Sequence, residues 1–178
     1  MKNLYFIYVL LVLTLLSSCK GKEEQTEKAT KEPEVFEVGF NLTFSKDDVF
    51  QLYYTEDGSL NFNDEMSIRL PQKGSENSQE VVFKMPNNVL PTNIRLDLGE
   101  NPEQKSIVVN SMRLKFYDNV FEAKDSLVSR YFYLLENQVK YDNKSSVISI
   151  VTPEGVFYDP LMWSNELLTD EIKKVIEK

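Results

Sequence analysis

The segment from Phe36 to Phe44 most constrains the fold of this chain. Large apolar side chains stand at every second position of this segment, and Glu37, Asn41 and Thr43 stand between them. Because successive side chains of a strand point to opposite faces, a period of two predicts a strand with one buried face. This is the clearest strand pattern in the chain, and it marks the start of the folded domain.

Five further segments are short and rich in β-branched or aromatic residues, which favours strands. They span residues 49–55, 66–70, 80–85, 93–98 and 106–116. The breaks between them contain turn-forming residues, among them Asp57-Gly58, Lys73-Gly74 and the stretch from Gly99 to Pro102. Closely spaced strands joined by such turns predict a mainly β fold, an antiparallel β-sandwich or jelly roll rather than a parallel α/β sheet.

The last third of the chain mixes helical and strand patterns. Between Asp125 and Leu135 the apolar residues are spaced by three and four, which predicts an amphipathic helix capped by Asp125 or Ser126, with a strand as the alternative. Residues 141–144, 147–151 and 155–158 are typical of a final hairpin.

The chain closes with a short helix that we expect to open at Thr169, Asp170 and Glu171. Its apolar residues fall on one stripe, formed by Leu168, Ile172, Val175 and Ile176. Such a stripe docks on its own domain or contacts a partner.

Cys19 is the only cysteine, and it directly follows an N-terminal apolar run. Lys2 supplies a positive charge ahead of the thirteen residues 4–16, and Ser17 and Ser18 are small. The Leu-Ser-Ser-Cys sequence ending at Cys19 resembles the lipobox of bacterial lipoproteins. The resemblance implies cleavage between Ser18 and Cys19 and lipid attached to the Cys19 thiol. An uncleaved membrane anchor is the alternative, but a spanning helix needs roughly 20 apolar residues.

The stretch from Lys20 to Pro33 is charged and polar and contains no large apolar residue. Such a segment cannot bury enough surface to offset the entropy of ordering it, so we expect a flexible tether. The predicted organisation is a signal peptide over 1–18, lipidated Cys19 and tether over 19–34, and one β-rich domain with a C-terminal helix over 35–178. Lys20 stands where an aspartate is associated with inner-membrane retention in Gram-negative lipoproteins. The resemblance therefore favours the outer membrane and leaves the leaflet open.

The chain is acidic, with 28 Asp and Glu against 20 Lys and Arg and a formal net charge of −8. Loss of the signal peptide would also remove Lys2 and make the net charge −9. An acidic protein gains nothing from counterion release on phosphates, so we expect no nucleic-acid partner.

The absence of histidine further restricts the catalytic and metal-binding sites that the chain can form. With Cys19 committed to lipid, His-dependent triads, His/Cys metal sites and intramolecular disulfides are excluded. A glycosidase built on paired carboxylates remains chemically open. We nevertheless expect a protein that is not an enzyme, with no catalytic residue, cofactor or metal.

A second resemblance covers Phe50 to Phe116. It rests on aromatic, apolar and turn positions in segments 50–55, 62–65, 81–86, 94–98 and 107–114. Together these look like the galactose-binding-like β-sandwich modules found beside bacterial glycosyltransferases and other cell-surface polysaccharide proteins. The resemblance implies a sandwich and a glycan ligand, but it transfers no individual ligand residue.

Aromatic residues are the first candidates for sugar contacts, because a pyranose packs its apolar face on an exposed ring while its hydroxyls meet polar neighbours. Trp163 is the best single candidate, with core packing as the alternative. Tyr53 and Tyr54 face opposite sides of one strand, so at most one of them stacks on a ligand. Arg95 and Asp97 project to one face, either as a polar clamp for a sugar or as a pair on a solvated surface.

Three short patterns have simpler explanations. Oxygen-bearing side chains stand at every second position, as in calcium loops, at Asp57, Ser59, Asn61 and Asn63. A polar hairpin tip needs the same residues. Asp125-Ser126-Leu127 resembles an O-glycosylation site used on exported proteins by some Gram-negative bacteria, and a helix cap explains it equally. We interpret Asp47-Asp48 as an ordinary turn.

The sequence therefore predicts a lipid-anchored, non-catalytic binding module of the cell envelope, attached to the membrane through lipid on Cys19. Glycan is the favoured ligand. The alternative is a structural lipoprotein that recruits an envelope protein through its helix or an exposed sheet edge.

Overall fold

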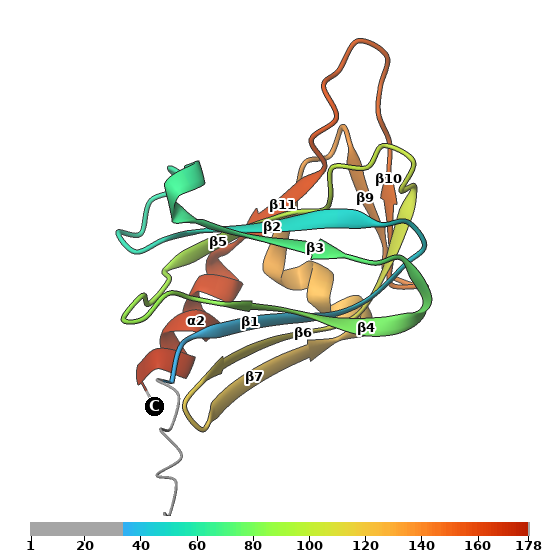
Figure 1. The fold of residues 1–178 in the computed structure, drawn as a ribbon. Helices are drawn as coiled ribbons and strands as arrows, with labels where there is room; N and C mark the ends of the chain where they lie inside the picture. Colours follow the sequence, from blue (N-terminus) through green and yellow to red (C-terminus); the bar gives the residue numbers. More distant parts are fainter. Residues whose placement is uncertain (1–33, 178) are drawn as a thin grey trace, which may run out of the picture. The chain divides into compact units, whose positions relative to one another are not determined.

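A computed structural model describes residues 34–177 (Figure 1). Within these residues two antiparallel sheets pack face to face, and helix α2 (Glu166–Glu177) follows the last strand. This confirms the predicted mainly β sandwich with a short C-terminal helical element. Cys19 and Ser18, the predicted lipid attachment and cleavage residues, and the tether up to residue 33 lie outside the described residues.

The first sheet contains six strands. Five follow the order β4-β1-β6-β10-β9, and β7 also pairs with β6. Their bounds are β1 (Glu37–Phe44), β4 (Ser75–Lys84), β6 (Ser106–Phe116), β7 (Asn119–Lys124), β9 (Val139–Asp142) and β10 (Val147–Ile150).

The second sheet contains five strands in the order β3-β2-β5-β11-β8. Their bounds are β2 (Asp48–Thr55), β3 (Ser67–Gln72), β5 (Asn93–Asp97), β8 (Phe132–Leu134) and β11 (Leu161–Ser164). The chain crosses from one sheet to the other after β1, β3, β4, β5, β7, β8 and β10, and such repeated crossing is typical of jelly-roll sandwiches.

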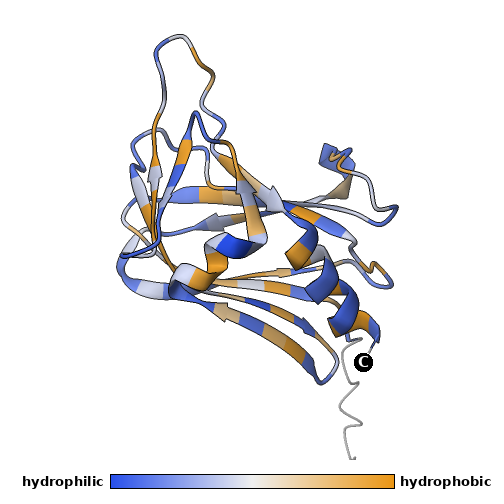
Figure 2. Ribbon diagram, turned by 180° about the vertical axis from the view of Figure 1, so that it is seen from behind, coloured by the Kyte–Doolittle hydropathy of each residue, from blue (hydrophilic) through white to orange (hydrophobic). Residues whose placement is uncertain are grey.

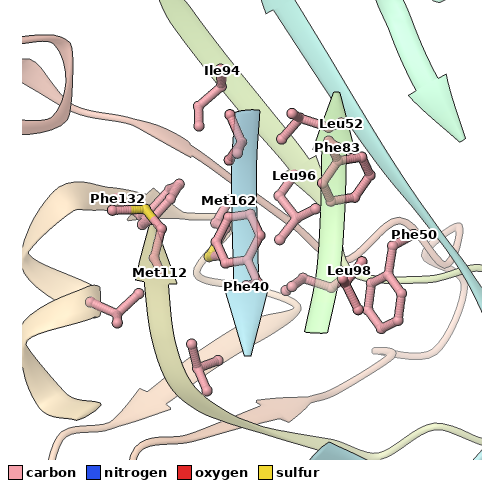
Figure 3. Packing of buried hydrophobic residues seen from close by; sticks show 14 of the residues in the cluster. Phe40, Phe50, Leu52, Phe83, Ile94, Leu96, Leu98, Met112, Phe132 and Met162 are labelled. Atoms are coloured by element: carbon pink, nitrogen blue, oxygen red, sulfur yellow. The ribbon is translucent and has the colours of Figure 1, made fainter. Parts of the chain in front are cut away.

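The core lies between the sheets (Figure 3). Phe40, Phe83 and Met112 come from the first sheet and face a row of buried residues on the second, which includes Leu52, Ile94, Leu96, Leu98 and Met162. Phe44 and Phe50 join the two sheets edge to face, with ring centroids 4.9 Å apart. Figure 2 shows hydrophobic and hydrophilic residues alternating along the strands, as strands with one buried face require.

Helix α2 buries the predicted stripe through Leu168, Ile172 and Val175. It begins before Thr169 because Asn165 caps it: the side-chain Oδ1 accepts hydrogen bonds from the backbone N–H groups of Leu167 and Leu168, at 3.0 and 3.3 Å. Within residues 34–177, no helix combines the length and the apolar character needed to cross a membrane.

The predicted amphipathic α-helix between residues 125 and 135 is wrong. A 3-10 helix, η2 (Asp125–Tyr131), is followed by β8, the strand that was the alternative. The N-cap position is Lys124, which makes no side-chain cap, and Asp125 has a φ of 48°. Pairing of Phe132 with Ser164 on β11 draws the segment into the second sheet, so tertiary pairing overrides the helical spacing.

The predicted final hairpin exists as β9 and β10, but residues 155–158 belong to a loop. This loop, residues 151–160, connects the first sheet back to the second through β11, a strand the sequence did not indicate. Trp163 consequently lies in a sheet rather than in the approach to the helix.

Candidate functional site

A row of four side chains crosses the outer face of the second sheet. Tyr53 on β2 pairs in register with Arg95 on β5, which pairs with Trp163 on β11, which pairs with Tyr133 on β8. Cross-strand partners share a face. Their neighbours along the strands point into the core: Leu52, Leu96 and Met162. The row therefore lies on the side of the sheet away from the core.

Arg95 forms the centre of a polar network. Its Nε and Nη2 atoms each donate to one carboxylate oxygen of Asp97, both at 2.7 Å. Its guanidinium carbon lies 4.5 Å from the centroid of the Tyr53 ring, within range of a cation–π contact. The Tyr53 hydroxyl in turn donates to Oδ1 of Asp64 at 2.9 Å. The prediction that Arg95 and Asp97 share a face is confirmed.

Burial changes the titration of this network. It raises the pKa of Tyr53 to about 12, and the hydrogen bond to Asp64 and the negative charge of Asp97 act in the same direction. Burial also raises the pKa of Asp97, while the hydrogen bonds from Arg95 oppose the rise. Tyr53 therefore stays a neutral hydrogen-bond donor at physiological pH.

These residues line a cleft of about 660 Å³. Its floor is formed by β2 and β5, and its walls by Asp64 in η1 (Asp64–Met66), by the β5–β6 turn and by residues 157–159 of the β10–β11 loop. In Figure 1, η1 and the β10–β11 loop rise from the same side of the second sheet. The volume lies within the range of small-molecule sites.

The β5–β6 turn is fixed to the sheet by Asp48. Its Oδ1 accepts from the backbone N–H groups of Val49, Glu100 and Asn101, at 2.8, 2.6 and 3.0 Å. Its Oδ2 is buried without a hydrogen-bond partner among the described residues. Burial raises the pKa of Asp48, and the backbone hydrogen bonds oppose the rise. The interpretation of Asp47-Asp48 as an ordinary turn is wrong for Asp48, which lies in β2.

The β10–β11 loop is also held by side-chain hydrogen bonds. The buried amide of Gln138 donates from Nε2 to the carbonyl of Phe157 at 3.0 Å and accepts at Oε1 from the N–H of Asp159 at 2.9 Å. The Tyr158 hydroxyl donates to the carbonyl of Asn101 at 3.0 Å. Phe157 itself is 85% exposed. Its backbone is fixed while its ring projects into solvent at the edge of the cleft.

The charges of the cleft are mostly paired. Nη2 of Arg69 lies 2.5 Å from Oε1 of Glu100, and Nη1 donates to Oε1 of Gln51 at 2.7 Å. Arg95 is bound by Asp97 and lies 4.0 Å from Asp159. Four carboxylates and two guanidinium groups line the cleft, so carboxylates are in excess.

The structure brings together Tyr53, Arg95 and Asp97 of the candidates found from the sequence. The Tyr53 ring is only 8% exposed because Arg95 covers it, and Tyr54 points into the core. Trp163 is partly exposed, with its ring centroid 5.9 Å from that of Tyr133.

Sequence reasoning missed three residues of this face, Asp64, Tyr133 and Phe157. Asp64 lies in residues 62–65, a segment that indicated only a family resemblance. The one available signal for Phe157 was an apolar aromatic residue in a turn-rich stretch.

Side chains in the segment with calcium-loop spacing accept hydrogen bonds from nearby backbone N–H groups. Asp57 Oδ1 accepts from the N–H of Ser59 at 2.9 Å, and Asn63 Oδ1 accepts from the N–H of Met66 at 3.1 Å. Between residues 34 and 177, no three His, Cys, Asp or Glu side chains gather as metal ligands. Ser126 lies in η2, where its carbonyl accepts from the hydroxyl of Ser129.

Comparison of the chain with protein families, with curated proteins and with solved structures finds no match.

Proposed function

We propose that the domain is a non-catalytic glycan-binding module whose site is the cleft on the outer face of the second sheet. The observation that carries the proposal is the exposed ring of Phe157, on a hydrogen-bonded backbone, in the same cleft as the Arg95–Asp97 pair. A sugar ring needs an apolar surface for one face and fixed donors and acceptors for its hydroxyls. The cleft offers both within one hollow.

Preorganisation supports this use of the cleft. Asp97 and Tyr53 fix the guanidinium of Arg95, and Gln138 binds the carbonyl of Phe157 and the N–H of Asp159. A site whose groups are already held loses little conformational entropy when a ligand binds. A phenylalanine ring that is 85% exposed buries little apolar surface within the domain, so it remains available for contact with a ligand.

The carboxylates of the cleft support binding rather than hydrolysis. Glycosidases need one carboxylic acid that gives a proton to the leaving group and a second that acts as nucleophile or base. Both oxygens of Asp97 already accept from Arg95, and Asp64 and Glu100 each accept from a neighbour. The fourth carboxylate, Asp159, lies 4.0 Å from Nη2 of Arg95.

We propose further that lipid on Cys19 anchors the module in the cell envelope, with the outer membrane favoured. This part rests on the lipobox-like sequence ending at Cys19 alone. Labelling of the protein in bacteria with an alkynyl fatty acid tests it, with Cys19→Ala as the control. Label retained by Cys19→Ala would overturn it.

A glycan array probed with the full chain in mild detergent tests the binding function. Phe157→Ala is expected to lose specific binding, whereas Tyr117→Ala, which removes another exposed aromatic ring outside the cleft, is expected to retain it. Binding to no glycan would overturn the proposal in favour of a protein partner. Release of reducing ends from a bound glycan would overturn its non-catalytic part.

A further inference from the structure

A second hollow lies at the far end of the row on the outer face. Its volume is about 380 Å³, and its lining includes Leu60, Tyr133, Asn165, Glu166 and Thr169. The Tyr133 hydroxyl donates to Oε2 of Glu166 at 2.8 Å, which fixes the ring, and Tyr133 is still 46% exposed. Like Phe157 in the cleft, Tyr133 is an exposed aromatic ring, and its own hydroxyl is hydrogen-bonded.

The row connects the two hollows without a break. Arg95 lines the cleft, its register partner Trp163 follows, and the ring of Trp163 contacts Tyr133, which lines the second hollow. From Tyr53 to Tyr133 the row crosses three strand-to-strand steps of about 4.8 Å, roughly 14 Å in all. A surface of this length is longer than one sugar ring.

We infer that this face binds an extended, uncharged glycan chain that runs across the strands from the cleft at Phe157 to the hollow at Tyr133. The inference rests on the proposed glycan-binding function and deepens it. Phe157 and Tyr133 each receive one ring of the chain, and Trp163 lies under the part between them.

The charges of the two hollows select the class of glycan. The second hollow adds Glu166 and Asp170 to the four carboxylates of the cleft, and no lysine lines either hollow. The two lining arginines, Arg69 and Arg95, are both paired with carboxylates. A chain of uronic acids or sulfated sugars would face like charge along its length, which disfavours it by repulsion. An uncharged chain meets donors and acceptors without this penalty.

The dependence of affinity on chain length tests the inference. Malto-, cello- and manno-oligosaccharides from monosaccharide to hexasaccharide, with oligogalacturonates as the anionic counterpart, are titrated into the full chain by calorimetry. For one neutral series we expect the dissociation constant to fall about two- to tenfold between the monosaccharide and the tetrasaccharide, because the longer chain gains a second aromatic contact.

Two variants locate the effect. Tyr133→Ala is expected to remove the gain in affinity with chain length, and Tyr133→Leu repeats the test with apolar surface retained. Leu167→Ala is the matched control, because Leu167 is similarly exposed but lines neither hollow. Equal affinity at all lengths, or tighter binding of oligogalacturonates, would overturn the inference and leave the proposed function standing. Binding of no glycan, neutral or anionic, would overturn the proposed function itself.

Discussion

The carboxylate of Asp48 lies directly against the Cα of Gly99, so that a Cβ at Gly99 would overlap the carboxylate oxygens of Asp48. Gly99 also has a φ of 116°, which side-chain-bearing residues rarely adopt. Only glycine lets the β5–β6 turn approach Asp48 closely enough for the N–H groups of Glu100 and Asn101 to reach its Oδ1. This pair of residues therefore sets the position of one wall of the cleft.

Gly99→Ala is expected to lower the free energy of unfolding by more than the roughly 1–3 kcal/mol that a strained backbone conformation costs. The additional loss comes from overlap with Asp48. Urea unfolding measures the total loss as a lower midpoint, with the slope of the unfolding free energy against urea concentration unchanged. Gly58→Ala is the matched control, since Gly58 has a φ of 79° and open space where a Cβ would lie. Equal losses in the two variants would contradict the steric role of Asp48.

Asp48→Asn tests the buried carboxylate through pH. Because burial raises the pKa of Asp48 above its ordinary 3.8, the folded state binds the proton more tightly than the unfolded state. The contribution of Asp48 to stability is therefore present at low pH and falls as the pH rises from about 3.8 through the raised value. The difference in unfolding free energy between wild type and Asp48→Asn should decrease over this window and then stay level.

Asp47→Asn provides the opposite control. Hydrogen bonds from the Lys73 ammonium and the Gly74 N–H lower the pKa of exposed Asp47, so its contribution is present above its ordinary pKa and is lost as the pH falls through the lowered value. Urea unfolding at a series of pH values yields both difference curves. A difference curve for Asp48→Asn that rises with pH would contradict the raised pKa.

Arg95→Lys is expected to lower the free energy of unfolding by about 1–2 kcal/mol, because an ammonium cannot bind Asp97 in a bidentate manner and lie flat on Tyr53 at once. Urea unfolding measures the loss. Arg69→Lys serves as the control: its side chain is 49% exposed against 23% for Arg95, and an exposed pair contributes less than about 1 kcal/mol. A larger loss in Arg69→Lys would refute the central role of Arg95.

The parts of the fold that the sequence predicted are those with local periodicity. Residues 36–44 alternate clearly, and β1 covers Glu37–Phe44. The stripe of α2 is buried as its spacing indicates. By contrast, β11 has only four residues, three of them buried, so it shows no alternation. The segment after Asp125 has helical spacing, but its pairing with β11 depends on residues about thirty positions away.

The candidate site was predictable only in part. Arg95 and Asp97 lie two apart on one strand, so their shared face follows from the strand alone. Asp48 binds N–H groups about 50 residues away, and Gln138 holds the Phe157 backbone. No local sequence pattern encodes contacts of this range. An exposed ring on a loop belongs to no periodic pattern, so the sequence did not indicate Phe157 as a site residue.

Asn165→Ala is expected to destabilise the protein by about 1 kcal/mol, because the first N–H groups of α2 lose their side-chain acceptor. Asn165→Ser keeps a capping oxygen but cannot reach the carbonyl of Arg130, to which Nδ2 of Asn165 donates at 2.8 Å. Chemical unfolding should therefore place the serine variant between wild type and Asn165→Ala. Identical stability of all three would show that water replaces the cap at no cost.

Gln138→Leu is expected to weaken glycan binding although Gln138 does not line the cleft. The substitution leaves the carbonyl of Phe157 and the N–H of Asp159 without their partner, which costs about 1–3 kcal/mol and frees the loop. Hydrogen exchange of the Asp159 amide should accelerate, and the affinity for the array-selected glycan should fall with it.

Gln104→Leu is the matched control for this last prediction. Gln104 is also buried, and its amide accepts from the N–H of Lys46 at 2.9 Å and donates to the carbonyl of Ser106, away from the β10–β11 loop. It should cost similar stability and leave exchange at Asp159 unchanged. If Gln138→Leu lowered stability without changing either the Asp159 exchange rate or the glycan affinity, a fixed Phe157 backbone would be unnecessary for binding.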